Sequence, residues 1–383
     1  MQPIYLDYAA TTPMRREVRE AMRPFLDDRF GNASSVHSWG RSARAALEEA
    51  RARLASLIGA SPAEIVFTRG GTEADNLAVL GRARAEKGAA VVCSAIEHKA
   101  VLMTARAAEA EGNPLHLLPC DPRGVVETGA LDEHLPARPA VVSVMWVNNE
   151  IGTIQPVGAL AERCAAAGVV FHTDAVQALG KLPIRVDETP VAMASVSAHK
   201  IGGPKGVGAL FVRKGTKLVP LIFGGGHERG LRAGTEDVAG AVGLAVAAEL
   251  ASAEREGLST RLRAMRDRLE AGLRQRVPDL VVNGGGAERT AHVLNVSIPG
   301  ASNETLLLSL DMEGIAVSSG SACSSGAVTP SHVLTALGLP LEISAPSVRF
   351  SLGRETTEGE IDRILTVFPP LMERLRALAA PLA

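Results

Sequence analysis

The sequence has no long apolar run and no excess of charge of one sign. With 40 Lys+Arg against 42 Asp+Glu, the formal net charge is −2, which gives no broad basic surface for nucleic acid or an anionic membrane. No apolar stretch reaches the length that spans a bilayer, and the first residues lack the basic and apolar segments of a secretory signal. We therefore expect a cytoplasmic protein with no nucleic-acid partner and no membrane partner.

Cysteine is also scarce. The cysteines Cys93, Cys120, Cys164 and Cys323 show neither Cys-x-x-Cys pairing nor a histidine at ligand spacing, so the sequence indicates neither a disulfide framework nor a structural zinc site. The first three lie in apolar segments, where a cysteine is usually a small buried hydrophobic residue. Cys323 differs, because residues 318–326 are rich in Ser and Gly and have no apolar periodicity.

The composition is that of a folded globular protein. The 383 residues are 46% hydrophobic and 21% charged, and this length favours two domains. Short β-branched runs at 65–68, 91–93, 141–147, 169–171 and 193–196 alternate with Ala-rich stretches. This alternation predicts an α/β fold whose large domain has a mostly parallel sheet flanked by helices.

The pattern changes near Gly257. A long charged helix is expected at 258–276, a strand at 292–298, a helix from 303, a strand at 348–352, and a final helix that is opened by Thr356-Thr357-Glu358 and reaches 378. These elements predict a second, smaller α+β domain. We assign 15–255 to the large domain, and 1–14 with 256–383 to the small domain.

The strands of the large domain end in polar residues. Lys200 follows the strand at 193–196 and precedes a Gly/Pro-rich turn, where partial burial would lower its pKa and suit it to form a Schiff base. A surface lysine in a turn is the ordinary alternative for such a residue. Open α/β sheets bind ligands at the carboxyl ends of their strands, which favours the functional interpretation.

Other strand ends point to the same crevice. Asp174 ends the strand that begins at 169, where it could pair with a cation or cap a helix. Gly71 and Thr72 come before an apolar helix, and such a helix N-terminus can bind a small phosphate or simply be capped. His98 and Asn149 follow two further strands. Each signal is weak alone, and their coincidence favours a ligand site.

The full set of motifs resembles the pyridoxal-phosphate cysteine desulfurases of the NifS/IscS type, within the class V aminotransferases of fold type I. That resemblance implies a large domain with a seven-stranded sheet. The motifs, which cover nearly the whole chain, are Tyr-Leu-Asp-Tyr-Ala-Ala-Thr-Thr-Pro at 5–13, Gly-Asn-Ala-Ser-Ser-Val-His at 31–37, Gly-Thr-Glu at 71–73, Glu-His-Lys at 97–99, Asn-Asn-Glu at 148–150, His-Thr-Asp at 172–174, Ser-Ala-His-Lys at 197–200, and the segments 224–235, 318–325 and 348–354.

The resemblance implies specific roles for site residues. Lys200 would hold pyridoxal 5'-phosphate and move the substrate's α-proton, and Asp174 would pair with the ring nitrogen. His98 would stack on the ring and handle protons. The other expected cofactor contacts are Gly71, Thr72, Ser197 and His199 at the phosphate, Asn149 and Gln177 at the phenolic oxygen, and Thr235 at the phosphate of the neighbouring subunit.

The resemblance also implies the substrate and the reaction. Arg349 would clamp the carboxylate of L-cysteine, with Asn149, Asn32 and His37 nearby. Cys323 would take the sulfur as a persulfide and leave L-alanine. No resident metal is expected, although Cys323 could transiently contact an iron–sulfur cluster.

The expected partners are a second copy of the chain, in a homodimer with shared sites, and a sulfur-acceptor protein. The acceptor stays open between an iron–sulfur scaffold and a carrier for thio-modification. Two other activities stay open as well: a selenocysteine lyase or cysteine sulfinate desulfinase, and a non-catalytic partner in sulfur transfer.

Overall fold

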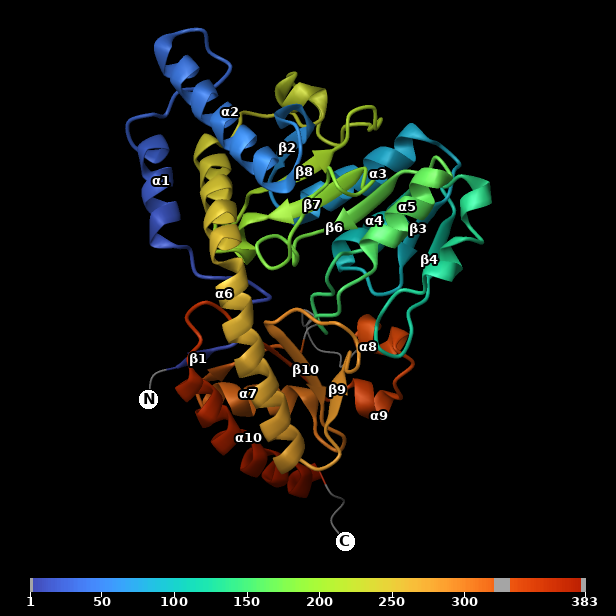
Figure 1. Cartoon of the computed structure of the whole chain (residues 1–383), viewed down its shortest axis with the longest axis vertical. Coiled ribbons are helices and arrows are strands. Elements are labelled where there is room, and N and C mark those ends of the chain that lie inside the picture. Colours follow the sequence, from blue (N-terminus) through green and yellow to red (C-terminus); the bar gives the residue numbers. More distant parts are fainter. Residues whose placement is uncertain (1–2, 320–330, 380–383) are drawn as a thin grey trace.

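A seven-stranded sheet forms the centre of the upper lobe in Figure 1, in the strand order β2-β8-β7-β6-β5-β3-β4. The computed structural model describes residues 3–319 and 331–379. From β7 to β4 the strands are parallel, and β8 pairs antiparallel with β7 and β2. The predicted α/β class and mostly parallel sheet are confirmed. The strands are β2 (Ile65–Thr68), β3 (Val91–Ser94), β4 (Leu115–Leu118), β5 (Val141–Ser143), β6 (Phe171–Asp174), β7 (Met193–Ser197) and β8 (Gly208–Val212).

Helices cover both faces of this sheet. Alternate residues of one strand enter different cores: Ile65 and Phe67 pack with α2 and α6, whereas Val66 packs with α3 and α4, as the two-residue period of a strand requires. Burial on both faces explains why these strands read as continuous apolar runs. The helices of this lobe are α1 (Arg16–Leu26), α2 (Ser38–Ile58), α3 (Gly71–Ala85), α4 (Lys99–Ala110), α5 (Val157–Ala166) and the first part of α6 (Val238–Arg276).

A smaller lobe lies below, around an antiparallel sheet of order β12-β10-β9. Its core includes Ile4 and Leu6 from the start of the chain, which lies beside β1 in this lobe (Figure 1). Within the described residues, no helix is both long and apolar enough to cross a membrane. The elements are β1 (Ile4–Tyr5), β9 (Val281–Asn283), β10 (Val293–Ser297), α7 (Asn303–Met312), β11 (Ile315–Ala316), α8 (His332–Ala336), α9 (Leu341–Ser344), β12 (Ser347–Ser351) and α10 (Glu358–Ala379).

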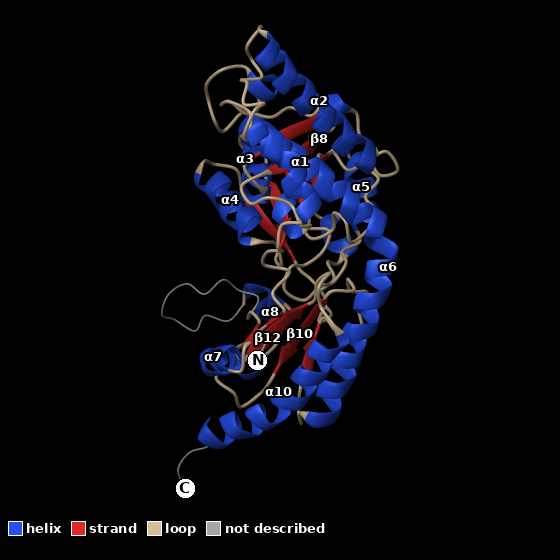
Figure 2. Ribbon diagram, turned by 90° about the vertical axis from the view of Figure 1, so that its left-hand side faces the viewer, coloured by secondary structure: helices blue, strands red, loops and turns tan. Residues whose placement is uncertain are grey.

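The long helix α6 joins the lobes without a break (Figure 2). The prediction that a new helix begins near 258 was wrong, because α6 runs from Val238 to Arg276 through the exposed Gly257. A glycine within a helix costs only about 1 kcal/mol. Both halves of α6 are buried, with Leu244 in the core of the upper lobe and Leu269 in that of the lower lobe. This packing outweighs the tendency of Gly257 to end the helix.

Other boundaries agree better with the sequence. The capping signal of α10 is confirmed: Thr357 accepts a hydrogen bond from the Glu360 amide at 3.3 Å and its own amide donates to the Glu360 carboxylate at 2.7 Å. The division into domains at 15–255 stays a prediction. Helix α8 packs through Val333 and Leu334 into the core of the upper lobe, although it follows most of the lower lobe in the chain.

A buried ion pair fastens a surface turn to the edge strand β2. Arg51 and Glu228 make a bidentate contact at 2.8 Å, with both side chains 3% exposed. Glu228 also accepts from the Phe67 amide at 2.8 Å, and Arg51 donates to the Ile65 carbonyl at 2.8 Å. Glu228 and Arg229 have φ values of 46° and 58°, a strained conformation for non-glycine residues. The ion pair holds this strained turn in place.

We expect Arg51→Met to lower the free energy of unfolding by about 3–5 kcal/mol, because it leaves the Glu228 carboxylate buried and unpaired. The control is Arg53→Met on the same helix, whose ion pair with Glu249 is 34% and 39% exposed and should contribute below about 1 kcal/mol. Urea unfolding of the three proteins measures the difference. If both variants lost the same unfolding free energy, the buried ion pair would not contribute more than the exposed one.

Candidate active site

A cavity of about 380 Å³ opens at the carboxyl ends of the large sheet, between the lobes. Its volume lies in the range of small-molecule sites. The upper lobe supplies most of its wall, and Arg349 enters from β12 of the lower lobe. The sequence-predicted residues that the structure brings together here are Gly71, Thr72, His98, Asn149, Asp174, Gln177, Ser197, His199, Lys200 and Arg349.

Asp174, the last residue of β6, places a carboxyl group at the floor of this cavity. It is 5% exposed, and its Oδ1 accepts from the Val176 amide at 2.9 Å. Burial raises the pKa of Asp174, whereas His98 and Lys200 act in the opposite direction. A cation brought next to this carboxylate would be stabilised, since a buried charge is costly without a partner.

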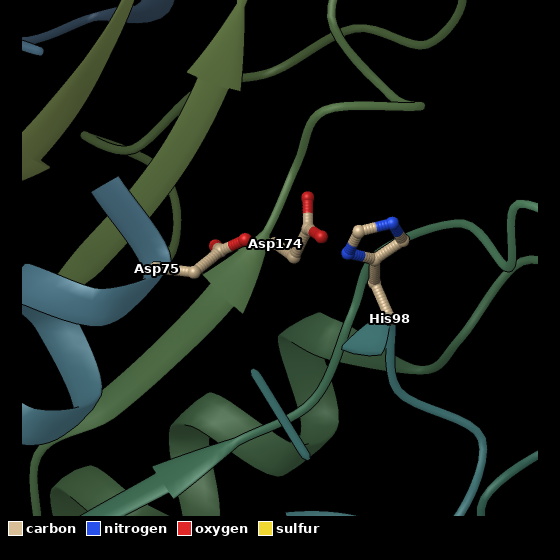
Figure 3. A group of neighbouring side chains, drawn as sticks. All are labelled: Asp75, His98 and Asp174. Carbon is tan, nitrogen blue, oxygen red and sulfur yellow. The ribbon is translucent and has the colours of Figure 1, made fainter. Parts of the chain in front are cut away.

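A second acid, Asp75 of α3, lies beside Asp174. Ligand atoms of Asp75, His98 and Asp174 all lie within 4.8 Å of one another, and Figure 3 shows the carboxyl of Asp174 between the other side chains. Burial and the neighbouring Asp174 raise the pKa of Asp75 well above its usual value. Because two adjacent carboxylates rarely ionise together, a second negative charge beside Asp174 is disfavoured.

A buried polar network supports these acids from below. His172 contacts Ser143 at 2.8 Å and Ser195 at 3.0 Å, so β5, β6 and β7 are linked by side chains as well as by their backbone. Burial lowers the pKa of His172 to about 3. The ring is therefore neutral and adds no positive charge beneath Asp174.

Lys200 follows β7 in a short 3-10 turn, Ala198–Lys200. Its Nζ donates to the carbonyls of Ala9 and Ala10 at 2.8 and 2.7 Å. Burial, with the charge of Arg349, lowers the pKa of Lys200 to about 8. A substantial neutral fraction near neutral pH makes this amine a nucleophile suited to Schiff-base chemistry.

The N-terminus of α3 forms a cradle for an anion. Gly70, the N-cap residue, has φ 138° and provides no side-chain cap, and a Cβ atom at Gly71 would approach the Val176 side chain to 2.7 Å, so no side chain of these two residues covers the first backbone amides of the helix. Thr72 and Ser197 line the same corner. Backbone amides and the positive helix end favour a phosphate here.

His199 lies beside this cradle with its Nδ1 3.2 Å from the Thr11 hydroxyl. Burial, with the neighbouring lysines, lowers the pKa of His199 to about 4. The neutral ring can hydrogen-bond an anion but does not add a charge to it.

Arg349 is 3% exposed and is held in a fixed orientation. Its guanidinium donates from Nη2 to Asp7 at 2.7 Å and from Nη1 to the Asn149 carbonyl at 2.8 Å. Among the described residues, its buried Nε has no hydrogen-bond partner. A buried donor is rarely left unsatisfied, and a planar guanidinium is well shaped for a carboxylate.

His98 has a structural contact as well as a place in the cavity. It is the N-cap of α4, where its Nδ1 accepts from the Ala100 amide at 3.1 Å. The surrounding protein lowers the pKa of His98 by desolvation, and Asp174 opposes this shift. With Nδ1 accepting from the backbone, Nε2 is the nitrogen that carries the proton of the neutral ring.

Several lining residues were not predicted as site residues. His332 comes from α8 and its Nε2 donates to the Glu97 carbonyl at 2.8 Å, while Ser331 donates to Glu150 at 2.5 Å. Asp75 could have been found from its helical spacing to Thr72, since residues three apart share a face. The other unpredicted lining residues are Ala9, Ala10, Lys99, Met145, Glu150, Val176 and Ser318.

Three predicted residues do not line this cavity. Thr235 follows the turn at Glu228, Asn32 accepts from the Ser34 amide at 2.8 Å, and His37 caps α2 by accepting from the Gly40 amide at 3.3 Å. Within one chain they are therefore not brought to the predicted cofactor residues. Cys323 lies outside the described residues.

The remaining cysteines are unsuited to nucleophilic chemistry. Cys93 and Cys164 are buried, as predicted, and Cys120 is partly buried. Burial raises the pKa of the Cys93 thiol, that of Cys164 to about 12 and that of Cys120 to about 11. Since the thiolate is the nucleophile, none of these thiols is ready to react.

The chain matches the model of the class-V aminotransferases over residues 4–364. It therefore belongs to this family, whose fold and lysine-centred cavity are described above. It is 46% identical over 378 residues to a protein of Dictyoglomus turgidum named cysteine desulfurase IscS, covering 98% of this chain and 96% of the relative. It is 47% identical over 382 residues to a cysteine desulfurase of Cereibacter sphaeroides, covering 99% and 98%.

A solved structure shows the same architecture over the same length. The structure titled NifS-like protein superposes with a TM-score of 0.89 at 35% identity, covering 98% of this chain and 99% of that chain. The relatives and this structure are similar to the chain over both lobes.

Glu97 offers a test of the electrostatics of this site. It is fully buried, and burial raises the pKa of Glu97 to about 8. The folded state thus keeps a proton that the unfolded chain loses near its ordinary pKa, so this residue lowers stability as the pH rises from about 4.5 to about 8. Its Oε1 accepts from Ser94 at 2.5 Å and from the Met145 amide at 2.7 Å.

Glu97→Gln keeps this acceptor and cannot ionise. We expect its free energy of unfolding to equal that of the parent protein at pH 5 and to be higher than that of the parent at pH 8. The gap should grow by up to about 1.4 kcal/mol per pH unit. Unfolding curves recorded at pH 5, 6.5 and 8 measure it. A gap that stays constant with pH would show that Glu97 does not hold the proton.

Proposed function

We propose that this protein is a cysteine desulfurase that uses pyridoxal 5'-phosphate to convert L-cysteine to L-alanine and to carry the sulfur on Cys323. The observation that carries the proposal is the meeting of Lys200, Asp174 and the α3 anion cradle in one cavity. Full-length similarity to relatives named cysteine desulfurase supports it.

The cavity suits this cofactor at each end. A buried carboxylate at Asp174 fits a protonated ring nitrogen, and the open amides of the α3 N-terminus with Thr72, Ser197 and His199 fit the phosphate. Pyridoxal phosphate joined to the amino group of the substrate, in place of the lysine, would draw electrons from the substrate's α-carbon and so weaken bonds at that carbon and its neighbour. The acid pair next to His98 could also hold a metal ion, but the lysine and the cradle favour the organic cofactor.

The side chains of this cavity would orient the substrate and move its protons. Arg349 binds the substrate carboxylate through its free Nε and so fixes the α-carbon. Lys200 takes the α-proton, a task for which its lowered pKa of about 8 is well matched near neutral pH. His98 would lie against the ring of the bound cofactor and exchange protons with the reacting groups. Asn149 and Gln177 would hold its phenolic oxygen.

Sulfur transfer would use Cys323. Its thiolate attacks the Sγ atom of bound cysteine, an S–S bond forms, and the Cβ–Sγ bond breaks with its electron pair left on Cβ. A proton added to Cβ completes alanine, and the enzyme keeps Cys–S–SH. The persulfide sulfur then passes to an acceptor protein, either an iron–sulfur scaffold or a carrier for thio-modification.

The active form would be a homodimer in the cytoplasm, with Thr235 reaching the phosphate of the neighbouring subunit. Thr235 does not line the cavity of its own chain, which is consistent with a role across an interface. Large apolar side chains are exposed near the α1–α2 connection and before this loop: Phe30 is 72%, Val36 88%, Trp39 58% and Phe223 76% exposed. Such exposure is typical of interfaces.

The proposal is tested by incubating the purified protein with pyridoxal phosphate, L-cysteine and a reductant. We expect equal amounts of alanine and sulfide from the parent protein, and a loss of at least about 100-fold for Lys200→Ala and for Cys323→Ser. Cysteine sulfinate and selenocysteine are assayed in parallel. Products from cysteine at the parent rate in Cys323→Ser would overturn the assignment, and activity on the other substrates alone would favour a lyase or desulfinase.

Shared sites are tested by mixing two inactive variants. Thr235→Ala and Lys200→Ala impair different parts of each site. In a mixed dimer, one site would combine the intact Lys200 of one chain with the intact Thr235 of the other, and the second site would have neither. Such a dimer should therefore have up to about half of the activity of the parental dimer. Each variant alone, refolded in the same way, is the control. Absence of recovery in a mixture shown to contain mixed dimers would count against a contribution of Thr235 across the interface.

A further inference from the structure

Lys181 lies just behind the cavity and contacts one of its residues. Its Nζ donates to Gln177 Oε1 at 2.8 Å, and Gln177 Nε2 donates to the Ala9 carbonyl at 2.9 Å. The same carbonyl accepts from Lys200 Nζ at 2.8 Å. A short chain of hydrogen bonds thus links Lys181 to the reactive lysine through the Gln177 amide.

Lys181 and the Ala9 carbonyl are the two partners of this amide. An amide can be turned by 180° with little change in shape, so its orientation is set by its partners. Lys181 offers hydrogen atoms at Nζ and Ala9 offers a carbonyl oxygen. These partners place Oε1 toward Lys181 and Nε2 toward Ala9 and the cavity. Only this orientation presents N–H donors to a ligand there.

Lys181 does not itself line the active-site cavity. It lines a separate cavity of about 380 Å³, on the other side of Lys200, together with His292 and Arg15. Among the hydrogen bonds of the described residues, Lys181 is connected to the first cavity through Gln177. Burial, with the charges of Lys200 and Arg349, lowers the pKa of Lys181 to about 7, and both its charged and neutral forms can donate to Gln177.

We propose that Lys181 is a positioning residue, which fixes the Gln177 amide so that its nitrogen donates to the phenolic oxygen of the bound cofactor. This inference rests on the proposed use of pyridoxal phosphate. Sequence reasoning gave Gln177 a place at that oxygen but gave Lys181 no role. The second cavity leaves space around Lys181 for a longer side chain.

The contact has a measurable consequence. A donor at the phenolic oxygen stabilises its negative charge, which is greatest when the linkage between Lys200 and the cofactor is deprotonated. The donor therefore lowers the apparent pKa of that linkage, and its loss raises the pKa. The linkage changes its visible absorption when it titrates, so a spectrum reports on the amide independently of turnover.

The experiment is a double-mutant cycle on the cofactor-loaded protein. Lys181→Met keeps the length of the side chain and removes the donor, and Gln177→Leu removes the amide. We expect each to raise the apparent pKa of the linkage by about one unit, and the double variant to shift it no further than Gln177→Leu alone. Lys181→Arg, which keeps a donor, should stay near the parent. Lys214→Met, at an exposed position, is the control for loss of a lysine.

The cycle also distinguishes the effect of the Lys181 charge on the apparent pKa of the linkage from the effect of its hydrogen bond to Gln177. Loss of a cation alone would raise the pKa in Lys181→Met, but that shift would add to the shift of Gln177→Leu. Additive shifts, or an unshifted Lys181→Met, would overturn the inference. If Lys181→Met does not fold, a shift in Lys181→Arg as large as that in Gln177→Leu would overturn it. A parent protein that forms no visible band with pyridoxal phosphate would instead defeat the proposed function.

Discussion

The site depends on a negative charge kept at the tip of a buried strand. Asp174 is almost inaccessible to water, and a carboxylate in that position needs a cation in reach. His172 below it is neutral and Asp75 beside it is a second acid, so the protein stabilises this charge through His98, the Val176 amide and Lys200. Under the proposed function, a cationic ring bound in the cavity would be a partner for this carboxylate. Lys200 and the α3 cradle would then hold the other parts of the same ligand.

Much of the fold follows from local sequence. Strand β2 matches its predicted range, and Thr357 and Glu360 close the predicted cap of α10. The sheet could be predicted because its strands are buried on both faces and read as apolar runs. The continuity of α6 could not be predicted at Gly257, because it depends on two distant cores that each bury one half of the helix.

The site was predictable where its residues follow strands. Asp174 and Lys200 stand at strand ends, and parallel strands bring their carboxyl ends together whatever the rest of the chain does. His332 and Lys181 had no such signal. His332 reaches the cavity because α8 packs against the upper lobe, and Lys181 matters only through a hydrogen bond to Gln177. Both contacts depend on tertiary packing, which no local pattern in the sequence indicates.

The first residues of the chain carry a further consequence. They contribute Ile4 and Leu6 to the lower core, then Asp7 to Arg349, and then the Ala9 and Ala10 carbonyls to Lys200. This short segment, which turns at residues 8–10, thus touches both Arg349 and Lys200. A displacement of the lower lobe would therefore bear directly on the hydrogen bonds that Lys200 makes.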